Sequence, residues 1–123
     1  MKILDLPLKR NWYEMIESGI KTEEYREFKP YWCCRLVAYK RIKPEISAGF
    51  PITWTPPHYS EWKAEDCYIR FKNFTHVRFR YGYTKRTMLR EIESITIGYG
   101  KPEWGAPTDR QVFIIKFKKG GEQ

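Results

Sequence analysis

The chain has 123 residues and a formal net charge of +8, and 17% of its residues are aromatic. This length suits a single core, so we predict one domain over residues 1–123. No apolar run approaches the ~20 residues of a membrane helix, and we predict no membrane partner. Positive charge beside many rings favours polyanionic partners, with RNA or a nucleotide first among them. The simpler alternative is a small basic protein whose charge only keeps it in solution.

The three cysteines predict reduced thiols and a cytoplasmic location. Their number is odd, Cys33 and Cys34 are adjacent, and no C-x-x-C pair is present. The charged N-terminal residues do not resemble a signal peptide. The spacing of Cys33, Cys34, Cys67, His58 and His76 matches no common zinc pattern, so we predict no metal and no other cofactor.

The first helix is predicted from Lys9 to Ser18. Trp12, Met15 and Ile16 fall at i, i+3 and i+4 and form one apolar stripe that we expect to face the core. Gly19 follows, where helices commonly end in the left-handed conformation that glycine adopts at little cost. We therefore expect the helix to end at this glycine.

The stretch after this helix concentrates opposite charges. Residues 22–26 read as a strand whose two faces alternate, with Thr22, Glu24 and Arg26 on one and Glu23 and Tyr25 on the other. Lys21 lies in the preceding turn, and its long stem can reach either face. If these groups line a cleft, they can grip a phosphate, hydrogen-bond a base or move a proton. The alternative is a polar strand in which Glu24 and Arg26 only neutralise each other.

Strand patterns dominate the rest of the chain. Residues 75–81 alternate, and residues 112–117 are apolar enough for burial on both faces. Pro30 is placed to open a helical turn. The other candidate strands are residues 36–38, 68–71 and 88–97, the last bent or bulged near Glu93 and Ser94. Five or six strands with one long N-terminal helix predict a small closed or partly closed β-barrel, since closure protects strand edges.

Two loops are predicted to have functions. Residues 39–66 form an irregular, proline-rich insertion, and loops of this length are usually functional lids or mobile segments. We expect Trp62 to pin the insertion to the barrel, whereas Trp54 either pins it or offers a ring to a base. Residues 98–105 are rich in glycine and aromatic side chains, and Trp104 is expected to close one mouth of the barrel.

A second basic cluster contains Arg78, Arg80, Lys85 and Arg86. Arg78 and Arg80 share a strand face, so their guanidinium groups can bridge successive phosphates of a nucleic acid. Substituting any of the three arginines by alanine is then expected to lower RNA affinity with little dependence on sequence. The alternative is a solvated charged face without a ligand.

The pattern G-x-K-x-x-E-x-R follows the first helix directly and is formed by Gly19, Lys21, Glu24 and Arg26. It resembles the signature of ASCH domains, small β-barrels of the PUA-like superfamily. Residues 1–8 look like the family's first strand leading into its first helix, and residues 29–32 and 101–105 look like segments of a phage and bacterial branch. The resemblance implies a mainly β (α+β) fold, a PUA-like barrel of five or six strands with one long N-terminal helix.

The resemblance also implies a module that binds RNA or a nucleotide in a charged cleft. Lys21 and Arg26 would contact phosphate, and Glu24, held ionised by Arg26, would accept hydrogen bonds from a base or a sugar hydroxyl. The predicted nucleic-acid-binding residues are Gly19, Lys21, Glu24, Arg26, Arg78, Arg80, Lys85 and Arg86.

Two other functions stay open. A hydrolase acting on RNA or modified nucleosides would use Lys21 and Glu24 as catalytic residues, since some ASCH proteins are ribonucleases. The family also includes an acetylcytidine amidohydrolase, but its motif threonine falls on Glu24 here, which argues against that activity. The third possibility is a protein-interaction module. The sequence predicts no oligomeric state.

Both the binding and the catalytic hypothesis require Lys21, Glu24 and Arg26 to converge on one accessible pocket with a Tyr or Trp ring nearby. Lys21 should point into that pocket, and its replacement by alanine should abolish nucleotide binding or turnover while costing less than ~1 kcal/mol of stability, as surface changes do.

Overall fold

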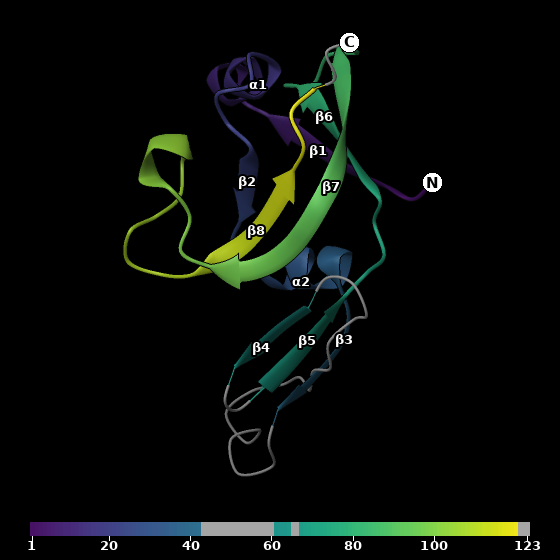
Figure 1. Cartoon of the computed structure of the whole chain (residues 1–123), viewed down its shortest axis with the longest axis vertical. Coiled ribbons are helices and arrows are strands. Elements are labelled where there is room, and N and C mark those ends of the chain that lie inside the picture. Colours follow the sequence, from purple (N-terminus) through teal and green to yellow (C-terminus); the bar gives the residue numbers. More distant parts are fainter. Residues whose placement is uncertain (43–60, 65–66, 121–123) are drawn as a thin grey trace.

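The computed structural model describes residues 1–42, 61–64 and 67–120 (Figure 1). Most of the regular structure is β. The elements in chain order are β1 (Ile3–Leu8), α1 (Arg10–Glu17), β2 (Glu23–Arg26), α2 (Pro30–Leu36), β3 (Val37–Ile42), β4 (Glu61–Ala64), β5 (Cys67–Phe71), β6 (His76–Tyr81), β7 (Thr87–Gly98), the 3-10 helix η1 (Pro102–Trp104) and β8 (Val112–Phe117).

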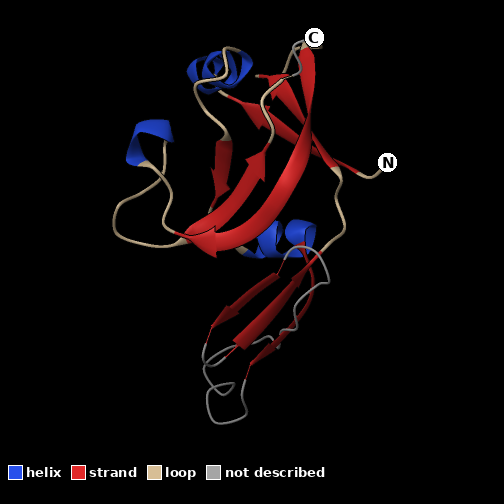
Figure 2. Ribbon diagram, viewed as in Figure 1, coloured by secondary structure: helices blue, strands red, loops and turns tan. Residues whose placement is uncertain are grey.

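The strands form two sheets. The larger sheet has the order β1-β6-β7-β8-β2, in which β1 and β6 run parallel and the other neighbours antiparallel. The smaller sheet has the order β3-β5-β4 and is antiparallel throughout. It extends from the end of the larger sheet at which α2 lies, whereas α1 lies at the opposite end (Figure 1 and Figure 2).

The main core joins the larger sheet to both α-helices. Most of its buried side chains come from β1, β6, β7 and β8, with Tyr13 and Ile16 contributed by α1 and Leu36 by α2. Val37 of β3, Phe71 of β5 and Phe74 complete it. A second, small cluster of Tyr25, Ala106 and Val112 covers β2 with the segment that follows η1. That segment is therefore packed onto the edge of the larger sheet.

The end of α1 follows the glycine prediction. Gly19 has φ +87°, and the Ile20 amide donates to the Met15 carbonyl at 3.0 Å while the Gly19 amide donates to Ile16 at 3.1 Å. These two bonds form a Schellman motif, which turns the chain sharply. The Lys21 amide also donates to the Met15 carbonyl, at 3.0 Å. The turn thus fixes the backbone of Lys21 against the helix end.

The apolar side chains of α1 face two different environments, the core and a pocket. Ile16 is buried in the core as predicted, together with Tyr13. Trp12 and Met15 are only half-buried. Trp12 lines a pocket beside β2 instead of the core.

The predicted bulge in β7 is confirmed by a register shift between Ile92 and Ser94. β7 pairs with β6 up to Glu91 and with β8 from Ile92 onward, so the shift lies where β7 begins to pair with β8. An irregularity of this kind bends a strand and increases its twist. The bend lets one long strand connect both halves of the larger sheet, as the curved ribbon of β7 shows (Figure 1).

The prediction of a PUA-like barrel with a long N-terminal helix was wrong. The larger sheet is open within the described part of the chain, with β1 and β2 at its two edges, and α1 has only eight residues. In a closed barrel, backbone hydrogen bonds would join the edge strands β1 and β2. Here the Arg26 side chain instead donates from Nη2 to the Pro7 carbonyl at 3.1 Å. A side chain therefore bridges the two edges, and the Schellman turn at Gly19 ends the helix after two turns.

The insertion predicted over residues 39–66 is not irregular throughout. β3 continues to Ile42, and β4 covers Glu61–Ala64. Both strands pair with β5. Pairing with a distant segment, rather than an alternation of polar and apolar residues, therefore makes these residues strands. Trp54 and the rest of the insertion lie outside the described residues, as does the side chain of Trp62 in β4.

Candidate functional site

A pocket of about 290 Å³ opens between the edge strands β1 and β2, beside α1 and η1. It lies where no ladder of backbone hydrogen bonds joins β1 to β2. Its lining residues are Pro7, Leu8, Lys9, Trp12, Lys21, Glu24, Tyr25, Arg26, Trp104 and Gly105. We call it the β2 pocket.

Lys21 is buried at the base of the β2 pocket, with 1% of its surface exposed. Its ammonium nitrogen donates to the Trp104 carbonyl at 2.6 Å and lies 2.8 Å from Glu24 Oε1. The nitrogen also sits 4.3 Å from the centre of the Trp12 ring, within cation–π range. Burial lowers the pKa of Lys21 below its usual value, and Glu24 opposes that shift.

Glu24 is the buried carboxylate of the site, with 4% of its surface exposed. Its Oε2 is hydrogen-bonded and ion-paired with Nη1 of Arg26. Its Oε1 lies 2.8 Å from the Lys21 ammonium. Both oxygens of this buried carboxylate are therefore held by cations, Oε1 by Lys21 and Oε2 by Arg26.

Arg26 bridges the pocket and the neighbouring helix α2. Besides Glu24, its Nη1 donates to the Tyr25 carbonyl at 2.9 Å, and its Nη2 donates to Pro7. Its guanidinium also lies 5.0 Å from the centre of the Trp32 ring. A guanidinium carries five N–H donors. Two of them therefore have no partner among the residues that the structure describes, and they remain available to an anion.

The segment after β7 forms the outer wall of the pocket. Tyr25 anchors it by donating from its hydroxyl to Glu23 at 2.8 Å and accepting from the Lys101 amide at 3.0 Å. Gly105 adopts φ +102° against the Trp12 ring, a conformation that side chains rarely take. These contacts hold the segment so that the Trp104 carbonyl lies beside the Lys21 ammonium.

The structure brings Lys21, Glu24 and Arg26 together beside tryptophan rings, as their spacing predicts. Gly19 contributes the turn before them and does not line the pocket. Lys21 is buried, which does not fit the expectation that its replacement costs as little stability as a surface change. Sequence reasoning also missed the carbonyls of Pro7 and Trp104, because any residue supplies a carbonyl and no sequence pattern marks the ones in use.

The second basic cluster lies apart from the β2 pocket, and none of its four residues lines that pocket. Nη2 of Arg86 donates to both carboxylate oxygens of Glu17, each at 2.9 Å, and Arg78 lies 3.5 Å from Asp5. Arg80 donates to the Thr84 carbonyl at 3.2 Å, and Lys85 is exposed. Two of the four charges are thus partly neutralised by carboxylates.

Comparison with known proteins adds no relative: no family model, curated protein or solved structure matches the chain. The ASCH resemblance therefore stays a prediction. No helix in residues 1–42, 61–64 and 67–120 has the length and apolarity needed to cross a membrane. Over the same ranges, no three His, Cys, Asp or Glu side chains are grouped to hold a metal ion.

Proposed function

We propose that the β2 pocket binds a phosphate-bearing nucleotide, either free or as part of an RNA strand. The observation that carries this proposal is a buried Lys21–Glu24–Arg26 network lining an open pocket instead of a closed core. Lys9, Lys21 and Arg26 give the lining three positive charges against the single carboxylate of Glu24. That excess favours an anionic ligand.

Each part of a nucleotide has a matching group in the pocket. The two unengaged donors of Arg26 suit phosphate oxygens, which guanidinium groups bind with directed hydrogen bonds. Glu24, the carboxylate of the pocket lining, suits an exocyclic amino group or a sugar hydroxyl. The half-buried rings of Trp12 and Trp104 suit the face of a base. Lys21 pairs with Glu24 and adds positive charge at the base of the pocket.

A calorimetric comparison of adenosine 5′-monophosphate with adenosine tests this proposal. We expect the nucleotide to bind at least tenfold more tightly, because a hydrogen bond to a charged group is worth about 1.5–3 kcal/mol. Replacing Arg26 by glutamine should remove most of that preference. Arg80→Gln is the matched control, since Arg80 lies outside the pocket and should leave the preference unchanged. Equal affinities of the parent for both ligands would contradict phosphate binding.

Hydrolysis is a second candidate, favoured by the lowered pKa of Lys21 beside Glu24. A buried lysine that loses its proton more readily can act as a general base. Turnover of RNA would then rise with pH below the ordinary lysine value of 10.5, and Lys21→Met would abolish it. RNA that remains intact after long incubation with the parent would exclude this ribonuclease activity.

A further inference from the structure

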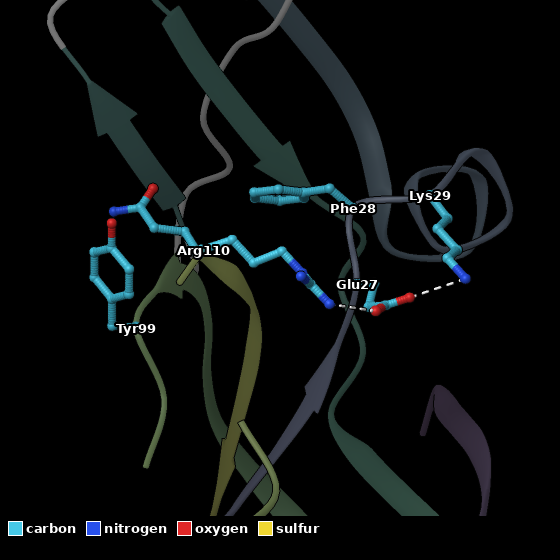
Figure 3. Close-up of a pocket in the computed structure, with 6 residues that line it drawn as sticks. Glu27, Phe28, Lys29, Tyr99 and Arg110 are labelled. Atoms are coloured by element: carbon cyan, nitrogen blue, oxygen red, sulfur yellow. Dashed lines mark hydrogen bonds and ion pairs between the residues drawn. The ribbon is translucent and has the colours of Figure 1, made fainter. Parts of the chain in front are cut away.

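A second pocket, of about 590 Å³, lies at the other end of β2. It is formed where the chain leaves β2 toward α2, where it leaves β7 and where it enters β8. Its lining residues are Glu27, Phe28, Lys29, Tyr99, Arg110 and Gln111 (Figure 3). We call it the Tyr99 pocket. None of its residues takes part in the Lys21–Glu24–Arg26 network.

Two aromatic rings in this pocket are held toward solvent. Phe28 is 46% exposed and Tyr99 is 65% exposed. The Phe28 ring packs edge-to-face against the buried Phe113 ring, with centroids 4.7 Å apart, so its position is set by the core. Exposed rings that gather in one hollow mark a binding surface more often than rings scattered singly. The flat faces suit another planar ring.

The charges around the Tyr99 pocket are balanced. Glu27 pairs with Lys29 at 2.9 Å and with Arg110 at 3.1 Å, and Arg110 also lies 3.3 Å from Asp109. Two cations therefore face two carboxylates. Figure 3 shows the Arg110 stem running past the Phe28 ring toward Glu27. Whereas the β2 pocket has excess positive charge, this balanced hollow suits an uncharged ring with polar edges, for which Gln111 and Arg110 offer hydrogen bonds.

The two pockets are lined by neighbouring parts of the chain. Arg26 lines the first and Glu27, directly after β2, lines the second, and each pocket also takes residues from the segment between β7 and β8. Glu24 and Glu27 are three residues apart, or about 10 Å along an extended chain. A single nucleotide occupies one pocket, whereas a short oligonucleotide can enter both.

We propose that the Tyr99 pocket is a second subsite, in which Tyr99 stacks on a base of the RNA strand whose phosphate-bearing nucleotide occupies the β2 pocket, and Phe28 adds an apolar contact to the same base. This inference rests on the function proposed above. It assigns the protein to single-stranded RNA of at least two nucleotides rather than to a free nucleotide. Stacking rings beside a cationic groove are the usual means of binding single strands.

The test compares binding of adenosine 5′-monophosphate with binding of tetra-adenylate RNA carrying a 5′-phosphate. The parent should bind the tetranucleotide at least tenfold more tightly. Tyr99→Ala should lower the tetranucleotide affinity about five- to 100-fold, the range for loss of one stacked base. The mononucleotide affinity should stay within about twofold, because Tyr99 does not line the β2 pocket. Tyr99→Phe keeps the ring and should bind like the parent.

Phe28→Ala provides a second variant, with its fold checked by thermal unfolding because Phe28 contacts the core. Tyr83→Ala is the matched control, since Tyr83 is equally aromatic and 96% exposed on the β6–β7 turn. The second subsite is overturned if Tyr99→Ala binds the tetranucleotide as tightly as the parent does. It is also overturned if the parent binds the tetranucleotide no more tightly than the mononucleotide. Either result leaves the proposal for the β2 pocket intact. A parent that binds neither ligand overturns both proposals.

Discussion

Replacing Lys21 by alanine is expected to destabilise the protein by about 3 kcal/mol, well beyond the cost of an ordinary surface change. Lys21 and Glu24 are both buried, so removal of the ammonium leaves a carboxylate in a site with little water. Breaking a buried ion pair in this way costs about 3–5 kcal/mol. We expect the lower end of this range because Arg26 still pairs with Glu24. Denaturant unfolding measures the change.

Three further variants separate charge from volume. Lys9→Ala removes an exposed lysine from the same pocket and should cost no more than about 0.5 kcal/mol. Lys21→Met keeps the stem but leaves Glu24 without its ammonium, whereas the double variant Lys21→Met with Glu24→Gln removes both charges. The double variant should recover much of the lost stability, since an uncharged replacement for a buried pair is often neutral. If Lys21→Ala and Lys9→Ala unfold at the same denaturant concentration, the buried pair contributes nothing to the fold.

Replacing Gly100 by alanine is expected to destabilise the protein by about 1–3 kcal/mol, the usual cost of overpacking. A Cβ atom at this position would lie 2.4 Å from Cε1 of Tyr25 and 2.7 Å from Cβ of Ala106. Neither neighbour can yield easily, because Tyr25 is held by hydrogen bonds with Glu23 and Lys101. The segment must shift instead, and it carries the Trp104 carbonyl that Lys21 requires. Nucleotide affinity should therefore fall together with stability.

Gly98→Ala is the control for this prediction. A Cβ atom there would meet only Cδ1 of Ile114, at 3.5 Å, which is an ordinary contact. The change should cost little in stability and leave ligand affinity intact. A Gly100→Ala variant that unfolds at the parental temperature and binds with parental affinity would show that the segment after β7 does not depend on its packing against Tyr25.

Local rules predicted much of the site. The Schellman end at Gly19 and the alternation of Glu24 with Arg26 both depend on neighbours in sequence, and so does the β7 bulge between Ile92 and Ser94. These features follow from the conformational freedom of glycine and from the period of a strand. Chemistry-bearing side chains could accordingly be named before any fold was known.

Features set by distant parts of the chain could not be predicted in this way. The edges β1 and β2 are bridged by Arg26 and the Pro7 carbonyl, a contact across 19 positions of sequence. The burial of Lys21 depends on Trp104, 83 positions away. The exposed rings of the Tyr99 pocket meet only through the arrangement of β2, β7 and β8. Each of these depends on tertiary packing, which leaves no periodic trace in sequence.

The central claim is that the β2 pocket holds a nucleotide. Its most direct test is a nuclear magnetic resonance titration of the parent with adenosine 5′-monophosphate, following the indole N–H signals of Trp12 and Trp104. Both rings line the pocket, so we predict that both signals move in a saturable manner, and that Lys21→Met abolishes the movement while Arg80→Gln, outside the pocket, retains it. Indole signals of Trp12 and Trp104 that stay in place at saturating nucleotide would contradict the account.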